Sequence, residues 1–164
     1  MRVQQLELSH IDPHLDTNFL IRLHNGEPEF VAYARANRAA GLRYSQPARD
    51  EFLASALGSP AQLQSLEQHF GIKLLAGIVP TAIDNAAGRL QNAFVGDALN
   101  RIFRRADAKV LAAAFLMGDC LATGDLQLFK RARDLGLNVD FVGSGTAARR
   151  AATYAPRSVA IPPP

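Results

Sequence analysis

Short apolar stretches alternate with longer helical ones along most of this chain, and this alternation most constrains its fold. We expect strands near residue 15 and at 42–45, 72–75, 121–123 and 139–142. The segments between them are typical of helices, several of which begin at a proline or end at a glycine. Repeated alternation of this kind favours a parallel α/β sandwich.

The length and composition indicate one globular unit. The chain has 164 residues and is 48% hydrophobic, which is enough for one domain with a substantial core and too little for two. We expect this domain to span residues 1–142. Residues 143–164 contain Gly-Ser-Gly, an Ala/Arg-rich stretch and a final Pro-Pro-Pro, without a core-forming pattern. We therefore expect this basic tail to be mobile or draped over the domain.

The net positive charge of the chain lies in that tail. There are 18 basic and 15 acidic residues, and the only charged residues after Val142 are Arg149, Arg150 and Arg157. The remaining 15 basic residues balance the 15 acidic ones within residues 1–142. A balanced domain is not a general binder of polyanions, so any contact with nucleic acid has to come from local patches.

Several features predict a cytoplasmic protein without a membrane anchor. Cys120 is the only cysteine, which excludes an intramolecular disulfide and a cysteine-rich zinc site. Its apolar surroundings favour a small buried side chain over a nucleophile. The longest apolar stretch, 110–117, is far shorter than the roughly 20 residues of a membrane helix. The amino terminus carries Glu7 and Asp12 and lacks the apolar core of a signal peptide.

Two acidic residues each follow a predicted strand at the turn into a helix. Asp16 comes directly after Leu15, and Asp125 comes after the sequence Leu-Ala-Thr-Gly at 121–124. Parallel strands end at the same edge of a sheet, where open α/β folds bind their ligands, so both carboxylates would meet there if their strands are near neighbours. The alternative is that each is an ordinary helix N-cap.

Two further acidic residues are candidates for the same edge. Asp107 stands at the start of the helix that leads into the strand before Asp125. Simple topology puts it at the opposite edge unless that helix is tilted or begins over the site, and its alternative role is to stabilise the helix start. Glu51, beside Asp50, is equally consistent with an exposed helical position.

Four stretches resemble the motifs of one family in the order in which that family has them. HLDTNFLIRL resembles the opening motif of PIN-domain nucleases, and YSQPARDEFLASAL resembles their second motif. RADAKVLAAAFLMGDCLATGDLQLF is similar to the third and fourth. The resemblance covers roughly residues 13–142 and implies a PIN-like three-layer sandwich, with a short, mostly parallel central sheet flanked by helices.

The resemblance also implies a function. It assigns catalysis and metal binding to Asp16, Glu51, Asp107 and Asp125, with Asn18 and Thr123 in support. Carboxylates are the ligands that Mg²⁺ or Mn²⁺ prefers, and two such ions could activate a water and stabilise the departing 3′-oxygen of RNA. The chain would then be a metal-dependent endoribonuclease. Its compact length resembles VapC-like toxins, which implies a cognate antitoxin as partner and a possible homodimer.

Basic residues near the predicted site are candidates for substrate binding. Arg104, Arg105 and Lys109 flank Asp107, and Lys130 follows Asp125. They could contact RNA phosphates, or they could form a solvated helix face. Lys109 departs from the family pattern, which has an apolar or small residue there. Without tryptophan, extensive base stacking is not expected.

Two alternative functions stay open. In a haloacid-dehalogenase-like phosphatase the aspartate at the end of the strand is a nucleophile, and a second aspartate follows two positions later. This chain has Asn18 at that position, which disfavours a phosphatase. From a different class, the domain could be a PIN-like RNA-binding or scaffold module whose carboxylates do not catalyse.

Overall fold

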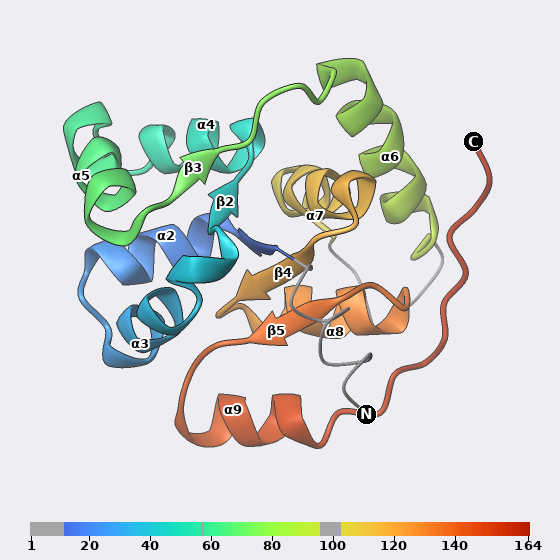
Figure 1. Ribbon diagram of the computed structural model, residues 1–164. Helices are drawn as coiled ribbons and strands as arrows, with labels where there is room; N and C mark the ends of the chain where they lie inside the picture. The colour runs from blue at the N-terminus through green and yellow to red at the C-terminus, as the bar shows by residue number, and fades with distance from the viewer. Residues whose placement is uncertain (1–11, 57, 96–102) are drawn as a thin grey trace.

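The computed structural model describes residues 12–56, 58–95 and 103–164. Five strands form one sheet in the order β3-β2-β1-β4-β5, and all four described strand pairings are parallel. Helices flank this central sheet (Figure 1). The predicted α/β class, with a short parallel sheet between helices, is therefore confirmed.

The strands are β1 (Pro13–Leu15), β2 (Arg43–Tyr44), β3 (Lys73–Leu74), β4 (Cys120–Thr123) and β5 (Val139–Phe141). The helices are α2 (Thr17–His24), α3 (Pro28–Ala36), α4 (Gln46–Ala54), α5 (Pro60–Phe70), α6 (Pro80–Asn92), α7 (Arg105–Met117), α8 (Leu126–Asp134) and α9 (Gly145–Ala152). A short 3-10 helix, η1 (Arg38–Ala40), ends the segment that the sequence predicts as one helix over 28–40.

Local sequence signals place most helix ends. Proline occupies the first turn of α3, α4, α5 and α6, where its missing N–H costs no hydrogen bond. Gly71 and Gly118 follow α5 and α7 with φ of 69° and 67°, a left-handed conformation that glycine adopts without strain. None of the helices in the described part of the chain is long and apolar enough to cross a membrane.

The sheet is buried on both sides at its centre. All three residues of β1 are buried, as are the last three of β4, which is typical of parallel strands covered by helices. β1 lies between β2 and β4, so the chain order reverses between β1 and β4. In open α/β sheets this reversal leaves a crevice beyond the carboxyl ends of the strands, and here it adjoins Asp16 and Asp125.

A partly buried polar network lies at the other edge of the sheet. His14 Nδ1 lies 3.2 Å from Asp119 Oδ2, and Arg43 Nη2 donates to Asp119 Oδ1 at 2.6 Å. Arg43 Nη2 also lies 2.9 Å from Asp12 Oδ2. The network links the starts of β1, β2 and β4 and therefore supports the register that aligns their far ends.

Residues 143–164 form α9 and an extended segment that contacts the domain (Figure 1). Asp134 Oδ1 accepts hydrogen bonds from the Tyr154 hydroxyl at 2.6 Å and from the Arg157 amide at 2.9 Å. Val159 and Ile161 pack against the core. The sequence pattern did not predict these core contacts, because single apolar residues in an extended segment have no periodicity.

Candidate active site

Asp16 is both a helix cap and a residue of the sheet edge. Its Oδ1 accepts a hydrogen bond from the Phe19 amide at 2.7 Å at the start of α2. Its Oδ2 accepts one from the Thr123 hydroxyl of β4 at 2.5 Å. The Asp16 amide donates to the Ala122 carbonyl at 3.3 Å. These bonds hold a carboxylate that is only 3% exposed against the neighbouring strand.

Asp125 has the same position after β4. Its Oδ1 accepts hydrogen bonds from the amides of Gln127 and Leu128, at 2.9 Å and 3.2 Å, and so caps α8. The Asp125 amide donates to Thr123 Oγ1 at 2.9 Å. Because the Thr123 hydroxyl also donates to Asp16, this one side chain connects the ends of both strands. The supporting role predicted for Thr123 thus has a geometric basis.

All four predicted acidic residues line one pocket of about 150 Å³ at this edge. The pocket is lined by Asp16, Thr17, Asn18, Ile21, Glu51, Arg104, Asp107, Val110, Asp125 and Leu128. Asp107 reaches it because α7 begins over the carboxyl edge of the sheet, which is the exception that simple topology had left open. Glu51 comes from α4, which packs against α7.

Burial, together with neighbouring carboxylates, raises the pKa of two acids of this pocket, Asp16 and Asp107. Burial raises the pKa of Asp16 from 3.8 to about 7; the hydrogen bonds from Thr123 and Phe19 lower it, and the charges of Asp125 and Asp107 raise it. Burial also raises the pKa of Asp107, to which Asp125 and Glu51 add and which Arg104 opposes. The pocket therefore favours a proton or a cation among its acids.

The donor set suits a hard cation, although the side chains do not converge on one point. Within residues 12–56, 58–95 and 103–164, no three His, Cys, Asp or Glu side chains are grouped closely enough to hold a metal ion. Two other oxygens of the pocket, Thr17 Oγ1 and Asn18 Oδ1, are buried without a hydrogen-bond partner. Buried oxygens without partners are costly, and Mg²⁺, Mn²⁺ or ordered water would satisfy them.

Gly124 allows the end of β4 to approach α2 and α3 closely. A Cβ at this position would lie 2.6 Å from Phe30 Cζ and 2.8 Å from Asn18 Oδ1. Both distances are shorter than non-bonded atoms tolerate, so the Thr-Gly-Asp sequence requires glycine here.

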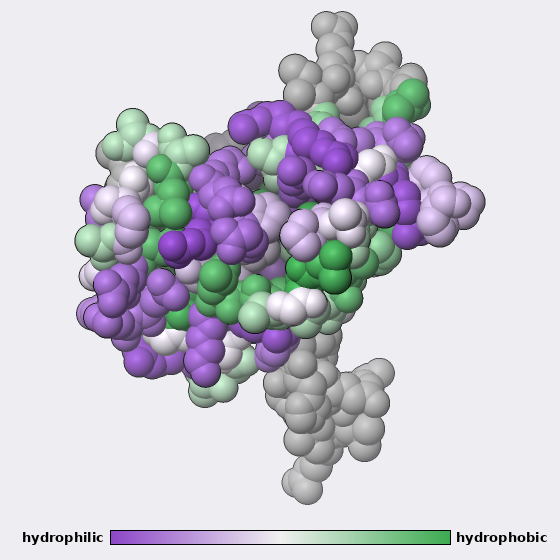
Figure 2. Space-filling view, turned by 90° about the horizontal axis from the view of Figure 1, so that it is seen from above, coloured by the Kyte–Doolittle hydropathy of each residue, from purple (hydrophilic) through white to green (hydrophobic). Residues whose placement is uncertain are grey.

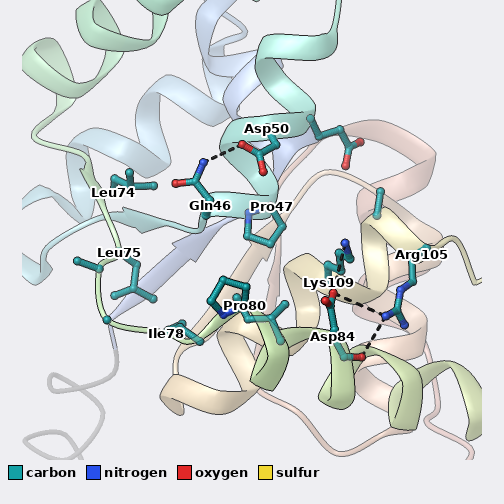
Figure 3. Close-up of a pocket in the computed structure, with 15 residues that line it drawn as sticks. Gln46, Pro47, Asp50, Leu74, Leu75, Ile78, Pro80, Asp84, Arg105 and Lys109 are labelled. Atoms are coloured by element: carbon teal, nitrogen blue, oxygen red, sulfur yellow. Dashed lines mark hydrogen bonds and ion pairs between the residues drawn. The ribbon is translucent and has the colours of Figure 1, made fainter.

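The four predicted basic residues do not share one location. Arg104 lines the carboxylate pocket, with Nη2 3.9 Å from Glu51 Oε1. Lys130 lies farther along α8, with Nζ 5.4 Å from the centre of the Tyr154 ring. Arg105 and Lys109 point into a neighbouring pocket instead (Figure 3).

The neighbouring pocket has a volume of about 850 Å³ and lies between α4, the 75–79 loop, α6 and α7. Its apolar side chains include Pro47, Leu75 and Pro80 (Figure 3). Seen from above, apolar surface lies between strongly hydrophilic areas on the molecule (Figure 2). Glu51 lines both pockets, so the two are adjacent.

Asp84 explains the direction of two of the basic side chains, and no sequence motif pointed to this residue. Its Oδ1 lies 3.3 Å from Lys109 Nζ and 3.7 Å from Arg105 Nη2. Asp84 belongs to α6, more than 20 residues before both cations, so no local spacing connects them. Cys120, predicted as a small buried side chain, is only partly buried; burial and the nearby Asp140 raise the pKa of its thiol to about 12, which disfavours a nucleophile.

The fold is similar to solved structures, although no protein-family model and no curated protein matches the sequence. A chain of VapBC-1 from nontypeable Haemophilus influenzae is 20% identical with a TM-score of 0.58, over 80% of this chain and 98% of that one. A chain of Rickettsia felis VapBC2, bound to a promoter DNA fragment, is 14% identical with a TM-score of 0.63, over 81% and 100%. DNA-bound VapBC from Salmonella typhimurium gives 16% identity and a TM-score of 0.61, over 80% and 98%. The chain therefore has a PIN-like fold of the kind found in VapBC complexes.

Proposed function

We propose that this chain is a metal-dependent endoribonuclease that hydrolyses cytoplasmic RNA at the carboxylate pocket. One observation carries the proposal: four carboxylates from four separate elements line one small pocket at the edge of the sheet. Capping accounts for the hydrogen bonds that Asp16 and Asp125 accept from backbone amides. It does not account for Glu51 and Asp107, which come from two other helices and cap nothing in this pocket.

Asp16, Glu51, Asp107 and Asp125 are the residues that would hold Mg²⁺ or Mn²⁺. When bound, the metal supplies Lewis-acid activation of water and of the phosphodiester. Thr123 fixes the orientation of Asp16, and the capping bonds of Asp125 use only Oδ1. Arg104 is 62% exposed at the pocket, which suits a contact with the substrate phosphate.

The test is cleavage of total RNA by purified protein with Mn²⁺, Mg²⁺ or EDTA, followed by mapping of the cut ends. Asp16→Asn and Asp125→Asn should abolish cleavage while keeping an oxygen that can cap the helix. Asp50→Asn is the matched control, because Asp50 neighbours Glu51 but lines only the larger pocket. Cleavage that persists in EDTA, or in both site variants, would contradict the proposal.

The absence of three converged ligands among the described residues favours a second candidate, a PIN-like RNA-binding or scaffold module without catalysis. The two functions differ in their response to metal. A nuclease should show a higher melting temperature with Mg²⁺ or Mn²⁺, and Asp16→Asn should not. A module that binds RNA, does not cleave it and shows no metal-dependent shift would be the second candidate.

We further propose that the nuclease is the toxin of a toxin-antitoxin pair, by analogy with the VapBC complexes. Induction of the chain alone in bacterial cells should then arrest growth, and Asp16→Asn should not. A homodimer is the expected assembly. Light scattering of the purified protein would distinguish it from a monomer of 17.7 kDa.

A further inference from the structure

The net positive charge of the chain lies in its last quarter. Residues 126–164 contain six basic and two acidic residues, whereas residues 1–125 contain twelve basic and thirteen acidic ones. The basic residues are Lys130, Arg131, Arg133, Arg149, Arg150 and Arg157. This segment includes α8, which begins at the carboxylate pocket, and α9. The charge therefore begins next to the candidate active site.

Helices α8 and α9 contact each other (Figure 1), and five of these six cations lie on them. Ala151 faces inward from α9, while Arg149 and Arg150 are exposed. Arg133 is exposed on α8, and Lys130 is partly exposed one turn earlier. We call Lys130, Arg133, Arg149 and Arg150 the α8–α9 basic surface.

The two acids of the segment offset only part of the charge of its six cations. Asp134 is 2% exposed and is bonded by the Tyr154 hydroxyl and by Arg157 Nε, at 2.6 Å and 3.2 Å. Asp140, on β5, accepts a hydrogen bond at 2.9 Å from the hydroxyl of Tyr33 on α3. Asp134 is thus buried and paired with Arg157, whereas Asp140 is exposed and lines a pocket with Arg133. The four cations Lys130, Arg133, Arg149 and Arg150 therefore outnumber the one exposed acid of the segment.

The other direction away from the carboxylate pocket is less favourable for a polyanion. The larger pocket beyond Glu51 is lined by three acids, Asp50, Glu51 and Asp84, and by two cations. Both cations, Arg105 and Lys109, are within 4.0 Å of Asp84. A chain of phosphates would meet net negative charge there and net positive charge along α8.

We propose that the α8–α9 basic surface binds the phosphate backbone of RNA on one side of the bond that is cut. This inference rests on the ribonuclease function proposed above. Lys130 lies five residues after Asp125, about 7 Å along the helix axis, so RNA leaving the pocket along α8 meets it first. Contacts of this kind position the RNA without reading its sequence.

The experiment measures binding of a short, labelled single-stranded RNA by fluorescence anisotropy in EDTA over a series of salt concentrations. The parent protein carries Asp16→Asn, so that no cleavage occurs. Removing two phosphate contacts with Arg149→Gln/Arg150→Gln should lower the slope of log affinity against log salt by about 1.4, which is about 25-fold weaker binding near 0.1 M salt. Arg35→Gln/Lys73→Gln removes two exposed charges from α3 and β3 and should change little.

Equal affinity and slope in the parent and the α9 variant would overturn the proposal, as would an equal loss in the control or a parent that does not bind RNA. Polyglutamate that displaces the RNA equally well per charge would assign the surface to an acidic protein instead. Because binding is measured without metal, it is independent of cleavage. If the enzyme cleaves RNA but the α9 variant binds RNA as well as its parent does, only the proposed RNA-binding surface is refuted. If the protein binds RNA but does not cleave it, only the proposed nuclease activity is refuted.

Discussion

Asp16 should make the protein less stable as the pH rises, and Asp16→Asn should remove this effect. In the folded state its pKa is raised to about 7, against 3.8 for an ordinary aspartate. Between these two values the unfolded chain has lost the proton that the folded protein still holds. Folding therefore takes up a proton in this range, and the free energy of unfolding falls with increasing pH.

The size of the effect follows from the same shift. A pKa raised from 3.8 to about 7 corresponds to about 4 kcal/mol of stability, which is fully present below the lower value and is lost progressively as the pH rises to the upper one. The raised pKa of Asp107 acts in the same direction. An asparagine at position 16 has no charge to bury and can still accept the hydrogen bond of the Phe19 amide. At alkaline pH the variant should consequently be the more stable protein.

The assay is urea denaturation in EDTA, followed by far-ultraviolet circular dichroism from about pH 4 to about pH 8, the range that spans both pKa values. Wild type should lose stability across this range much more than Asp16→Asn. Saturating Mg²⁺ or Mn²⁺ at the upper end should restore wild type and leave the variant unchanged. Parallel curves for the two proteins, or a wild type that becomes more stable toward alkaline pH, would refute the reasoning.

Three further substitutions test other parts of the structure. Gly124→Ala should cost about 1–3 kcal/mol of stability and reduce RNA cleavage, because the new methyl group would meet Phe30 at 2.6 Å; thermal unfolding and a cleavage assay check both. Tyr154→Phe should lower stability by roughly 1–2 kcal/mol, since it removes a hydrogen bond to buried Asp134, as a shift in melting temperature would show. Lys109→Gln should cost less than about 1 kcal/mol and leave cleavage unchanged.

The sequence predicted those features that depend on local patterns. An acid between a strand and a helix is expected at the edge of the sheet. This pattern predicts the positions of Asp16 and Asp125 at the edge without knowledge of the strand order. The order itself, with β1 beside β4, depends on pairing between residues more than 100 positions apart. No local pattern contains that information. The prediction that the two acids lie close together therefore depended on the family resemblance.

The directions of side chains and the path of residues 143–164 could not be predicted from the sequence, for a related reason. Arg105 and Lys109 flank Asp107 in sequence, but successive residues of a helix point in different directions, and these two face α6. The Ala/Arg-rich stretch after residue 143 forms α9, whose single buried residue is Ala151. One buried alanine is too weak a signal for a packed helix.

Capping and metal binding, which the sequence presents as alternatives for Asp16 and Asp125, are compatible in this geometry. A carboxylate has two oxygens with about four acceptor positions, and the capping bonds of Asp125 occupy only Oδ1. At Asp16 the amide of Phe19 uses one oxygen and Thr123 the other, which leaves a lone pair on each. The capping hydrogen bonds fix the positions of both carboxylates, and burial makes the charge of Asp16 costly unless a cation accompanies it. Substitution to asparagine separates the two roles, because the amide can still cap the helix but carries no charge.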